Sequence, residues 1–83
     1  MELKIGSAVI SLAGRDKDRY LVVLKLEGDY AYLADGILRR IENPKKKKLK
    51  HLAITKTVFE DEFLMNNKRL KTAIQERFGA QSR

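Results

Sequence analysis

The stretch "YLVVLKL", residues 20 to 26, constrains the fold of this chain more than any other. In an extended strand, Val22, Leu24 and Leu26 point to one side while Leu21 and Val23 point to the other, so both faces are apolar. Such a strand has to be covered on both sides. In a chain of 83 residues, a small, closed or strongly curled barrel provides that cover.

Turn signals divide the region around this strand at a spacing of about 8–12 residues, which is typical of a small all-β barrel. They are the "AGRDKD" cluster with Gly14, the "EGD" at 27–29, and the "DG" at 35–36, which favours a type I′ hairpin turn. We therefore expect a mostly β fold, a small five-stranded barrel. The expected strands are 8–12, 20–26, 30–34, 37–42 and 51–55.

The last third of the chain changes to a helical period. Leu70, Ala73, Ile74 and Phe78 recur at helical spacing, which predicts a short amphipathic α-helix packed on the barrel. Asn66 or Asn67 is a suitable N-cap, because asparagine is favoured at the start of a helix. Gly79 is a suitable C-terminal stop, because glycine is favoured just after the end of a helix.

The segment 57–65 admits two interpretations. Thr57 and Glu60 are spaced as in a capping box, which predicts a helical turn, whereas Phe59, Phe63 and Leu64 would also suit an extended connection. We expect one domain, with the barrel in residues 1–56 and the connector and helix in residues 57–83.

Composition excludes several classes of protein. Without cysteine, the chain has no disulfide and no cysteine-ligated zinc to stabilise it. No stretch approaches the roughly 20 apolar residues of a membrane span, and the first residues do not resemble a signal peptide. We expect a cytoplasmic protein that does not act at a membrane and is a monomer.

Charge is distributed unevenly along the chain. Residues 1–44 contain equal numbers of basic and acidic side chains, so residues 45–83 carry the whole net charge of +7. This asymmetry is typical of a protein that binds a polyanion.

The stretch "NPKKKKLKH", residues 43 to 51, concentrates this charge. Because it lies between two expected strands, we predict a loop of lysines held at both ends by the sheet, with Leu49 packed back against the barrel.

Arg39 and Arg40 are adjacent on the expected fourth strand and would point to opposite faces. If the first turn and the lysine loop meet at one end of the barrel, their charges form one phosphate-binding surface. The alternative is a solvated charge run that only keeps the protein soluble. The candidate RNA-binding residues are Arg15, Lys17, Arg19, Arg39, Arg40, Lys45, Lys46, Lys47, Lys48, Lys50 and His51; for His51, a structural role is an equal alternative.

The sequence gives little support for a catalytic site. The single histidine, His51, has no cysteine partner, and the four aspartates of the first half lie in expected turns, where Asp is favoured for local hydrogen bonds. We expect neither an enzyme nor a cofactor, metal or small-molecule substrate.

Three tyrosines are candidates for stacking on RNA bases: Tyr20, Tyr30 and Tyr32. Tyr30 and Tyr32 share one face of their strand, where aromatic side chains usually pack the barrel or the helix. We expect packing rather than stacking.

The stretch "IGSAVISLAGRDKDRYLVVLKL" resembles a KOW motif, with Gly6, Val9, Gly14, Arg15 and Lys17 at the matching positions. Together with "ADG", "NPKKK" and "KHL" in order, residues 4 to 56 are similar to KOW-domain RNA-binding proteins related to a large-subunit ribosomal protein family of archaea and eukaryotes. The motif usually has a second glycine after the turn lysine. This chain has Asp18 there, which adopts a left-handed conformation less freely than glycine.

The resemblance implies an SH3-like β-barrel that binds structured RNA, most plausibly ribosomal RNA on the ribosome, with no cofactor and no reaction. By position it implies RNA contacts from Arg15, Lys17, Arg39, the lysines at 45–48 and Lys50. The alternative function is an SH3-like protein-interaction module, on which Leu70, Ile74 and Phe78 would dock a protein partner.

Overall fold

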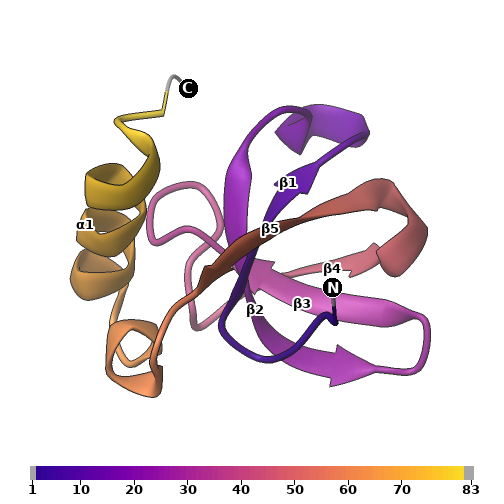
Figure 1. Cartoon of the computed structure of the whole chain (residues 1–83), viewed down its shortest axis with the longest axis horizontal. Coiled ribbons are helices and arrows are strands. Elements are labelled where there is room, and N and C mark those ends of the chain that lie inside the picture. The colour runs from indigo at the N-terminus through magenta and orange to yellow at the C-terminus, as the bar shows by residue number, and fades with distance from the viewer. Residues whose placement is uncertain (1, 82–83) are drawn as a thin grey trace.

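The computed structural model describes residues 2–81. It contains a five-stranded antiparallel sheet with the strand order β4-β3-β2-β1-β5 and a single α-helix. The strands are β1 (Ser7–Ser11), β2 (Tyr20–Glu27), β3 (Tyr30–Ala34), β4 (Lys45–Lys48) and β5 (Leu52–Val58). Three short 3₁₀ turns, η1 (Gly14–Asp16), η2 (Leu49–His51) and η3 (Asp61–Leu64), and the helix α1 (Asn67–Phe78) complete the chain. The expected mostly β fold with a C-terminal helix is confirmed (Figure 1).

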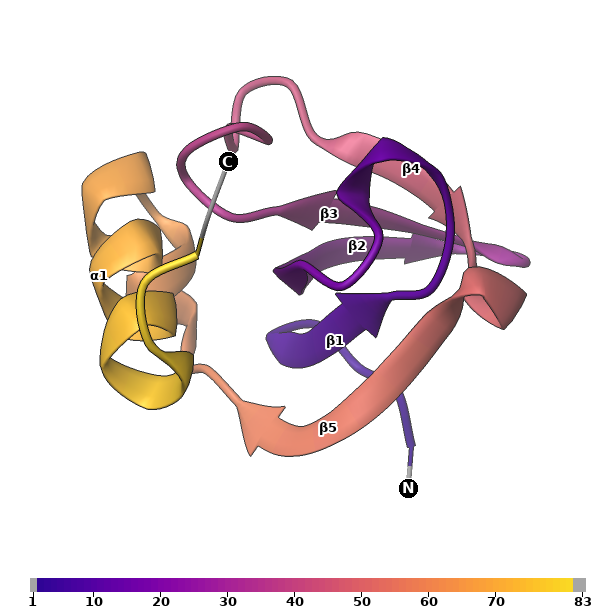
Figure 2. The same cartoon turned by 90° about the horizontal axis from the view of Figure 1, so that it is seen from above.

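The two edge strands of the sheet are consecutive in sequence. Only the three residues of η2 separate the end of β4 from the start of β5, so the sheet curls until its two edges meet at that point (Figure 2). Within residues 2–81, β4 pairs only with β3, and β5 pairs only with β1. The sheet is therefore strongly curled, but in the described residues no pairing between β4 and β5 closes it.

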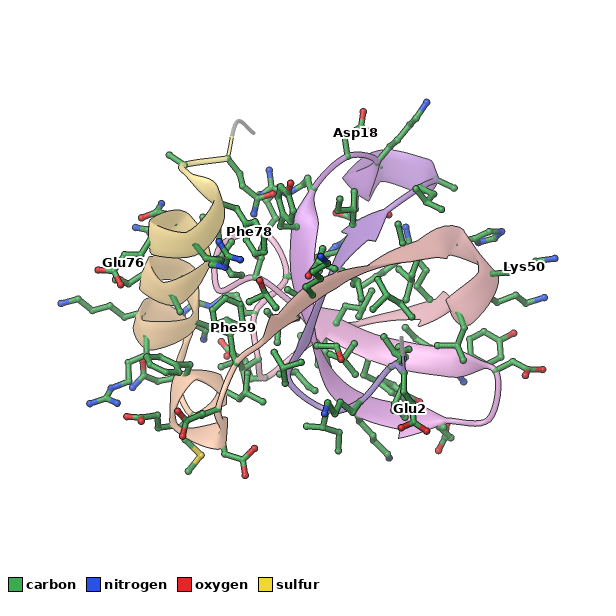
Figure 3. All side chains as sticks on the ribbon, in the orientation of Figure 1. Glu2, Asp18, Lys50, Phe59, Glu76 and Phe78 are labelled. Carbon is green, nitrogen blue, oxygen red and sulfur yellow. The ribbon has the colours of Figure 1, made fainter. Side chains whose placement is uncertain are left out.

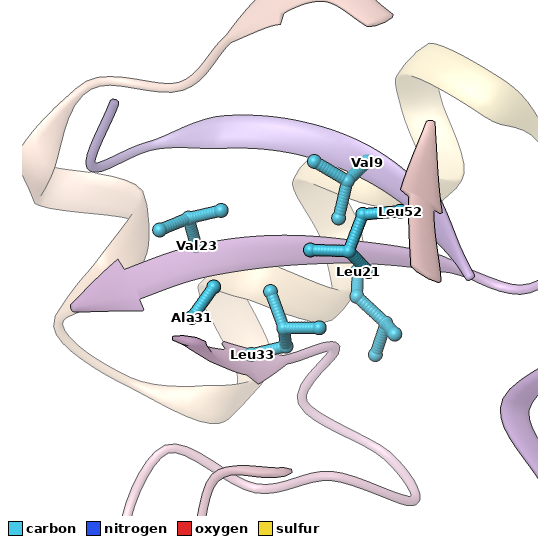
Figure 4. Packing of buried hydrophobic residues seen from close by; sticks show 6 residues of the cluster. All are labelled: Val9, Leu21, Val23, Ala31, Leu33 and Leu52. Carbon is cyan, nitrogen blue, oxygen red and sulfur yellow. The ribbon is translucent and has the colours of Figure 1, made fainter. Parts of the chain in front are cut away.

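Strand β2 is covered on both sides, as its sequence predicts. On the inner side, Leu21 and Val23 belong to a fully enclosed cluster with Val9, Ala31, Leu33 and Leu52 (Figure 4). Leu49 packs against the same cluster, as expected.

On the outer side, Val22 and Ala34 pack against Leu70 and Ile74 of α1. Figure 3 shows Phe59 and Phe78 pointing into the space between helix and sheet.

A β-bulge changes the direction of side chains along β2. The register shifts between Val23 and Lys25, so Lys25 lies opposite Tyr32 on the outer face and Leu26 lies opposite Ala31 on the inner side. The expectation that Leu26 shares a face with Val22 and Leu24 is therefore wrong beyond the bulge.

The helix begins and ends where the sequence predicts. Asn66 is the N-cap, its side chain accepting a hydrogen bond of 2.8 Å from the backbone N–H of Arg69. Gly79 has a φ of 89° and ends the helix. In the preceding segment, β5 runs to Val58, two residues beyond the expected end of the barrel at 56, so Thr57 lies in a strand and the expected capping box is wrong. A helical turn does form further along, in η3, whose N-cap Glu60 makes no side-chain cap hydrogen bond.

The predicted strand 37–42 is wrong, because residues 35–44 form a loop. The carboxylate of Asp35 accepts hydrogen bonds from the backbone N–H groups of Ile37 and Arg39, and the carbonyl of Arg39 accepts from Asp35 and Gly36. These local bonds satisfy the backbone groups that a hairpin would pair with β3. Arg39 and Arg40 are therefore loop residues, and "DG" starts the loop between β3 and β4 rather than a tight two-residue hairpin turn.

The fourth strand is the lysine run itself. Tyr30, Ala31, Tyr32 and Leu33 of β3 pair in turn with the lysines 48, 47, 46 and 45. The predicted lysine loop is wrong for residues 45–48. Lys50 and His51 lie in the turn that follows.

Candidate nucleic-acid interface

Strand β4 distributes its lysines between two surfaces, because neighbouring side chains of a strand point to opposite faces. Lys45 and Lys47 point toward the turn η1, where they line a hollow. Lys46 and Lys48 point to the outer face of the sheet, above Tyr30 and Tyr32. One edge strand thus joins two basic surfaces.

We call the first surface the basic pocket. It has a volume of about 370 Å³ and lies between η1, the 35–44 loop and β4. Its lining residues are Ala13, Gly14, Arg15, Asp16, Arg39, Lys45, Lys47 and His51. The expected convergence of the first turn with the lysine run is confirmed only in part, because Arg15, Lys45 and Lys47 meet at this pocket whereas Lys17, Lys46, Lys48 and Lys50 do not line it.

Two of these cations are engaged within the protein. The ammonium of Lys47 donates to Ser11 Oγ and to the carbonyl of Ala13, both at 2.7 Å, and burial lowers the pKa of Lys47 below its usual value. The guanidinium of Arg39 donates through Nε and Nη2 to the buried carboxylate of Asp16, at 3.1 and 3.0 Å. Lys45, Arg15 and His51 complete the wall.

The turn η1 is shaped by a residue with an unusual backbone conformation. Asp18 has a φ of 70°, which lies in the left-handed region that residues other than glycine adopt less freely. Its N–H donates to the carbonyl of Ser11, which returns the chain to β2.

The second surface is the tyrosine face, formed by Lys25, Glu27, Tyr30, Tyr32, Lys46 and Lys48 on the outer side of β2, β3 and β4. Cross-strand pairing places Tyr32 between Lys25 and Lys46, and Tyr30 between Glu27 and Lys48. The Nζ atom of Lys46 lies 4.6 Å from the ring centre of Tyr30, and that of Lys25 lies 5.3 Å from the ring centre of Tyr32.

The three tyrosines have different surroundings. Tyr20 stacks on Phe78 with ring centres 4.0 Å apart, so its expected packing role is confirmed. Tyr30 and Tyr32 are half-buried on the outer face and belong to neither hydrophobic cluster. For these two rings, the expectation of core packing is wrong, because α1 covers only the other part of that face.

Some predicted site residues lie away from both surfaces. Arg19 is buried and donates to Asp35 at 2.8 Å. Arg40 is exposed and pairs with Glu42 at 2.9 Å. Lys17 is exposed on the side of η1 that faces the C-terminal end of the chain, beside Asp18 and Gln81.

Lys50 projects to solvent from η2, at the end of the molecule opposite α1 (Figure 3). It lines a second hollow, of about 460 Å³, together with Asp29, Tyr30, Lys48 and Leu49. Lys50 is therefore next to the tyrosine face, and this hollow continues that face around the end of β3.

Sequence reasoning missed Lys25 as a member of this interface. Regular alternation along β2 would point Lys25 to the inner side, and only the bulge turns it outward beside Tyr32. Asp16 and Ser11 were also missed as the acceptors that hold Arg39 and Lys47.

The described residues contain neither a cluster of metal-binding side chains nor a membrane-spanning helix. Residues 2–81 contain no group of three or more His, Asp or Glu side chains placed to share a metal ion. In the same part of the chain, no helix has the length and apolar character that crossing a membrane requires.

Comparison with known proteins does not assign the chain to a family. No protein-family model matches the sequence, and no curated protein matches it with significant similarity.

Proposed function

We propose that this protein binds RNA mainly through phosphate contacts and carries out no reaction. The observation that supports this most is the alternation of lysines along β4, which gives both faces of one exposed edge a positive charge. Lysine ammonium groups act as point charges on a phosphate backbone and supply affinity without reading sequence.

The residues that we assign to phosphate binding are the accessible ones. They are Arg15, Lys45, Lys46, Lys48 and Lys50, with His51 and the partly exposed Arg39, which is already paired with Asp16, at the wall of the pocket. Arg19 and Lys47 are buried and hold the fold around the pocket, so we assign them a structural role.

The resemblance of residues 4 to 56 to KOW-domain proteins supports ribosomal RNA as the ligand, and therefore the ribosome and the cytoplasm as the place of action. It also supports an SH3-like barrel as the finer description of the curled sheet. The three-residue η2 connection between the two edge strands is compatible with that description.

The alternative function, a protein-interaction module, loses its proposed docking residues. Leu70 and Ile74 are buried against the sheet, and Phe78 is stacked on Tyr20. A second alternative is that the lysines only protect the β4 edge against pairing with another chain, since charged residues often have that role on edge strands.

A titration with ribosomal RNA tests the proposal. We expect saturable binding at about 50 mM salt and a binding constant that falls by orders of magnitude by about 200 mM. Absence of saturable binding at low salt would overturn the proposal in favour of simple edge protection. Sedimentation of the protein with purified ribosomal subunits then tests the ribosome as the partner, and naked RNA binding without subunit binding would contradict that part.

A further inference from the structure

The tyrosine face offers chemistry that phosphate binding does not use. Two aromatic rings lie on one side of β3 in a part of the sheet that the helix does not cover, whereas Ala34 on the same strand packs against α1. Their positions two residues apart in β3 place them about 6.6 Å apart along the strand, on one side. We propose that Tyr30 and Tyr32 stack on unpaired bases of the bound RNA, an inference that rests on the proposed function.

The ring faces are reachable by a ligand. Each is approached by flexible side chains: Lys46 lies 4.6 Å from the ring centre of Tyr30 and 5.8 Å from that of Tyr32, and Lys48 lies 6.0 Å from that of Tyr30. A base that stacks on a ring would displace an ammonium group from it. The displaced ammonium then remains within reach of the phosphate attached to that base.

The charge of this face favours an anionic ligand. Three lysines surround the rings on this face, against the carboxylate of Glu27, and Asp29 adds a second carboxylate in the hollow beside Tyr30. Glu27 lies 3.8 Å from Lys25 and 3.9 Å from Lys46, distances at which exposed ion pairs are weak and easily exchanged. Its closer contact is with the hydroxyl of Tyr32, which donates to it at 3.0 Å and so fixes the orientation of that ring.

The hollow beside Tyr30 extends the face. Lys48 and Lys50 supply positive charge there, and the carboxylate of Asp29 can accept a hydrogen bond from an amino group of a base. An unstacked base next to Tyr30 would therefore find both a phosphate contact and a polar partner for its edge.

These features select a class of RNA. Bases of a continuous duplex are stacked on one another and cannot lie on a protein ring, whereas loops, bulges and single strands expose their faces. The ligand class is therefore RNA that presents an unpaired segment to the tyrosine face.

Fluorescence anisotropy with two probes tests this inference. One probe is an unstructured RNA of about 12 nucleotides, a length within the range of single-strand site sizes. The other probe is a blunt duplex of the same length. We expect Tyr30→Leu to weaken single-strand binding about tenfold, since stacking contributes about 1–3 kcal/mol per base. Duplex binding and the salt dependence of both should stay unchanged.

The matched control is Tyr30→Phe, which keeps the ring and should keep the single-strand affinity. Thermal unfolding of each variant confirms that the fold is intact, and quenching of tyrosine emission in the wild type by the single-strand probe reports stacking directly. Equal losses for both probes, or no loss with Tyr30→Leu, would overturn the stacking inference alone. Failure of the wild type to bind either probe at low salt would overturn the proposed function with it.

Discussion

The guanidinium of Arg19 donates to the carboxylate of Asp35 at 2.8 Å, and both side chains are almost fully enclosed, at 9% and 0% exposure. A second ion pair, from Arg39 to Asp16, runs between the same two segments in the opposite direction. The 35–44 loop is thereby tied to the turn between β1 and β2 by two crossed pairs. Since Asp16 and Arg39 line the basic pocket, the pair between them holds two of its walls together.

The first prediction concerns this buried pair. Arg19→Met leaves the buried Asp35 carboxylate without the guanidinium, so it should lower the free energy of unfolding by about 3–5 kcal/mol, and Asp35→Asn, which removes the carboxylate charge from the same pair, should also be destabilising. The double variant should lose less than the sum of the two, because each single loss includes the interaction between the two side chains. Urea denaturation of the four proteins measures this. Additive losses would show that the two charges are not energetically coupled.

An exposed ion pair supplies the matched control. Glu62→Gln breaks the pair with Arg69, in which both side chains are more than half exposed. We expect a change below about 1 kcal/mol in the same denaturation experiment.

The second prediction concerns the contact between the 35–44 loop and the helix. Gly36 has a φ of 81°, and a Cβ atom there would collide with the carbonyl oxygen of Asn67 and lie 3.0 Å from the backbone N–H of Lys71. Gly36→Ala should therefore lower the free energy of unfolding for two reasons. The left-handed conformation costs about 1–2 kcal/mol for alanine, and overpacking against the helix costs about 1–3 kcal/mol more.

Gly28→Ala separates these two costs. Gly28 also has a positive φ, of 58°, but a Cβ atom there meets nothing within 4 Å. It should show only the conformational cost in thermal or urea unfolding, about 1–2 kcal/mol. Equal losses at the two glycines would show that the helix yields to the added methyl group.

The sequence predicts a helix or a strand best where apolar side chains recur at the spacing typical of that element. The apolar spacing of Leu70, Ile74 and Phe78 and the caps at Asn66 and Gly79 locate α1 to within a residue. The two apolar faces of β2 likewise predict a covered strand. The signal is absent in β4, because four identical lysines show no period, although Lys47 is buried and Lys46 is exposed.

Contacts that the spacing of apolar and polar residues does not reveal account for the other differences. The run at 37–42 alternates like a strand, but Asp35 binds the backbone of Ile37 and Arg39 and closes a loop instead. The exposure of Tyr30 and Tyr32 depends on where α1 ends on the sheet, which local sequence does not specify. The basic pocket could be predicted as a convergence of charges, whereas the engagement of Lys47 and Arg39 by internal acceptors could not.

The third prediction concerns pH. The side-chain amide of Asn67 donates to Glu42 at 2.7 Å, and Arg40 donates at 2.9 Å, which lowers the pKa of Glu42 from 4.5 to about 2. Because the folded protein holds this carboxylate ionised, its contribution to stability is present above pH 4.5. That contribution is lost as the pH falls from about 4.5 to about 2.

Two measurements check the titration of Glu42. The side-chain carboxyl resonance of Glu42 should titrate near pH 2 by NMR, and Asn67→Ala should move this midpoint back toward 4.5. The stability difference between wild type and Glu42→Gln should shrink as the pH is lowered through that range. A midpoint near 4.5 in the wild type would contradict the hydrogen bond from Asn67.

The fourth prediction separates accessible lysines from the buried one in the same strand. Lys46→Gln and Lys48→Gln each remove a charge from the open side of β4, so each should reduce the slope of log K against log salt for RNA by about 1. Lys47→Met removes an ammonium that is held by Ser11 and Ala13, so it should leave the slope unchanged. Salt titrations of the three variants by anisotropy, after a thermal check of folding, measure this. Equal changes at all three positions would mean that RNA responds to net charge alone, without regard to the direction in which each lysine points.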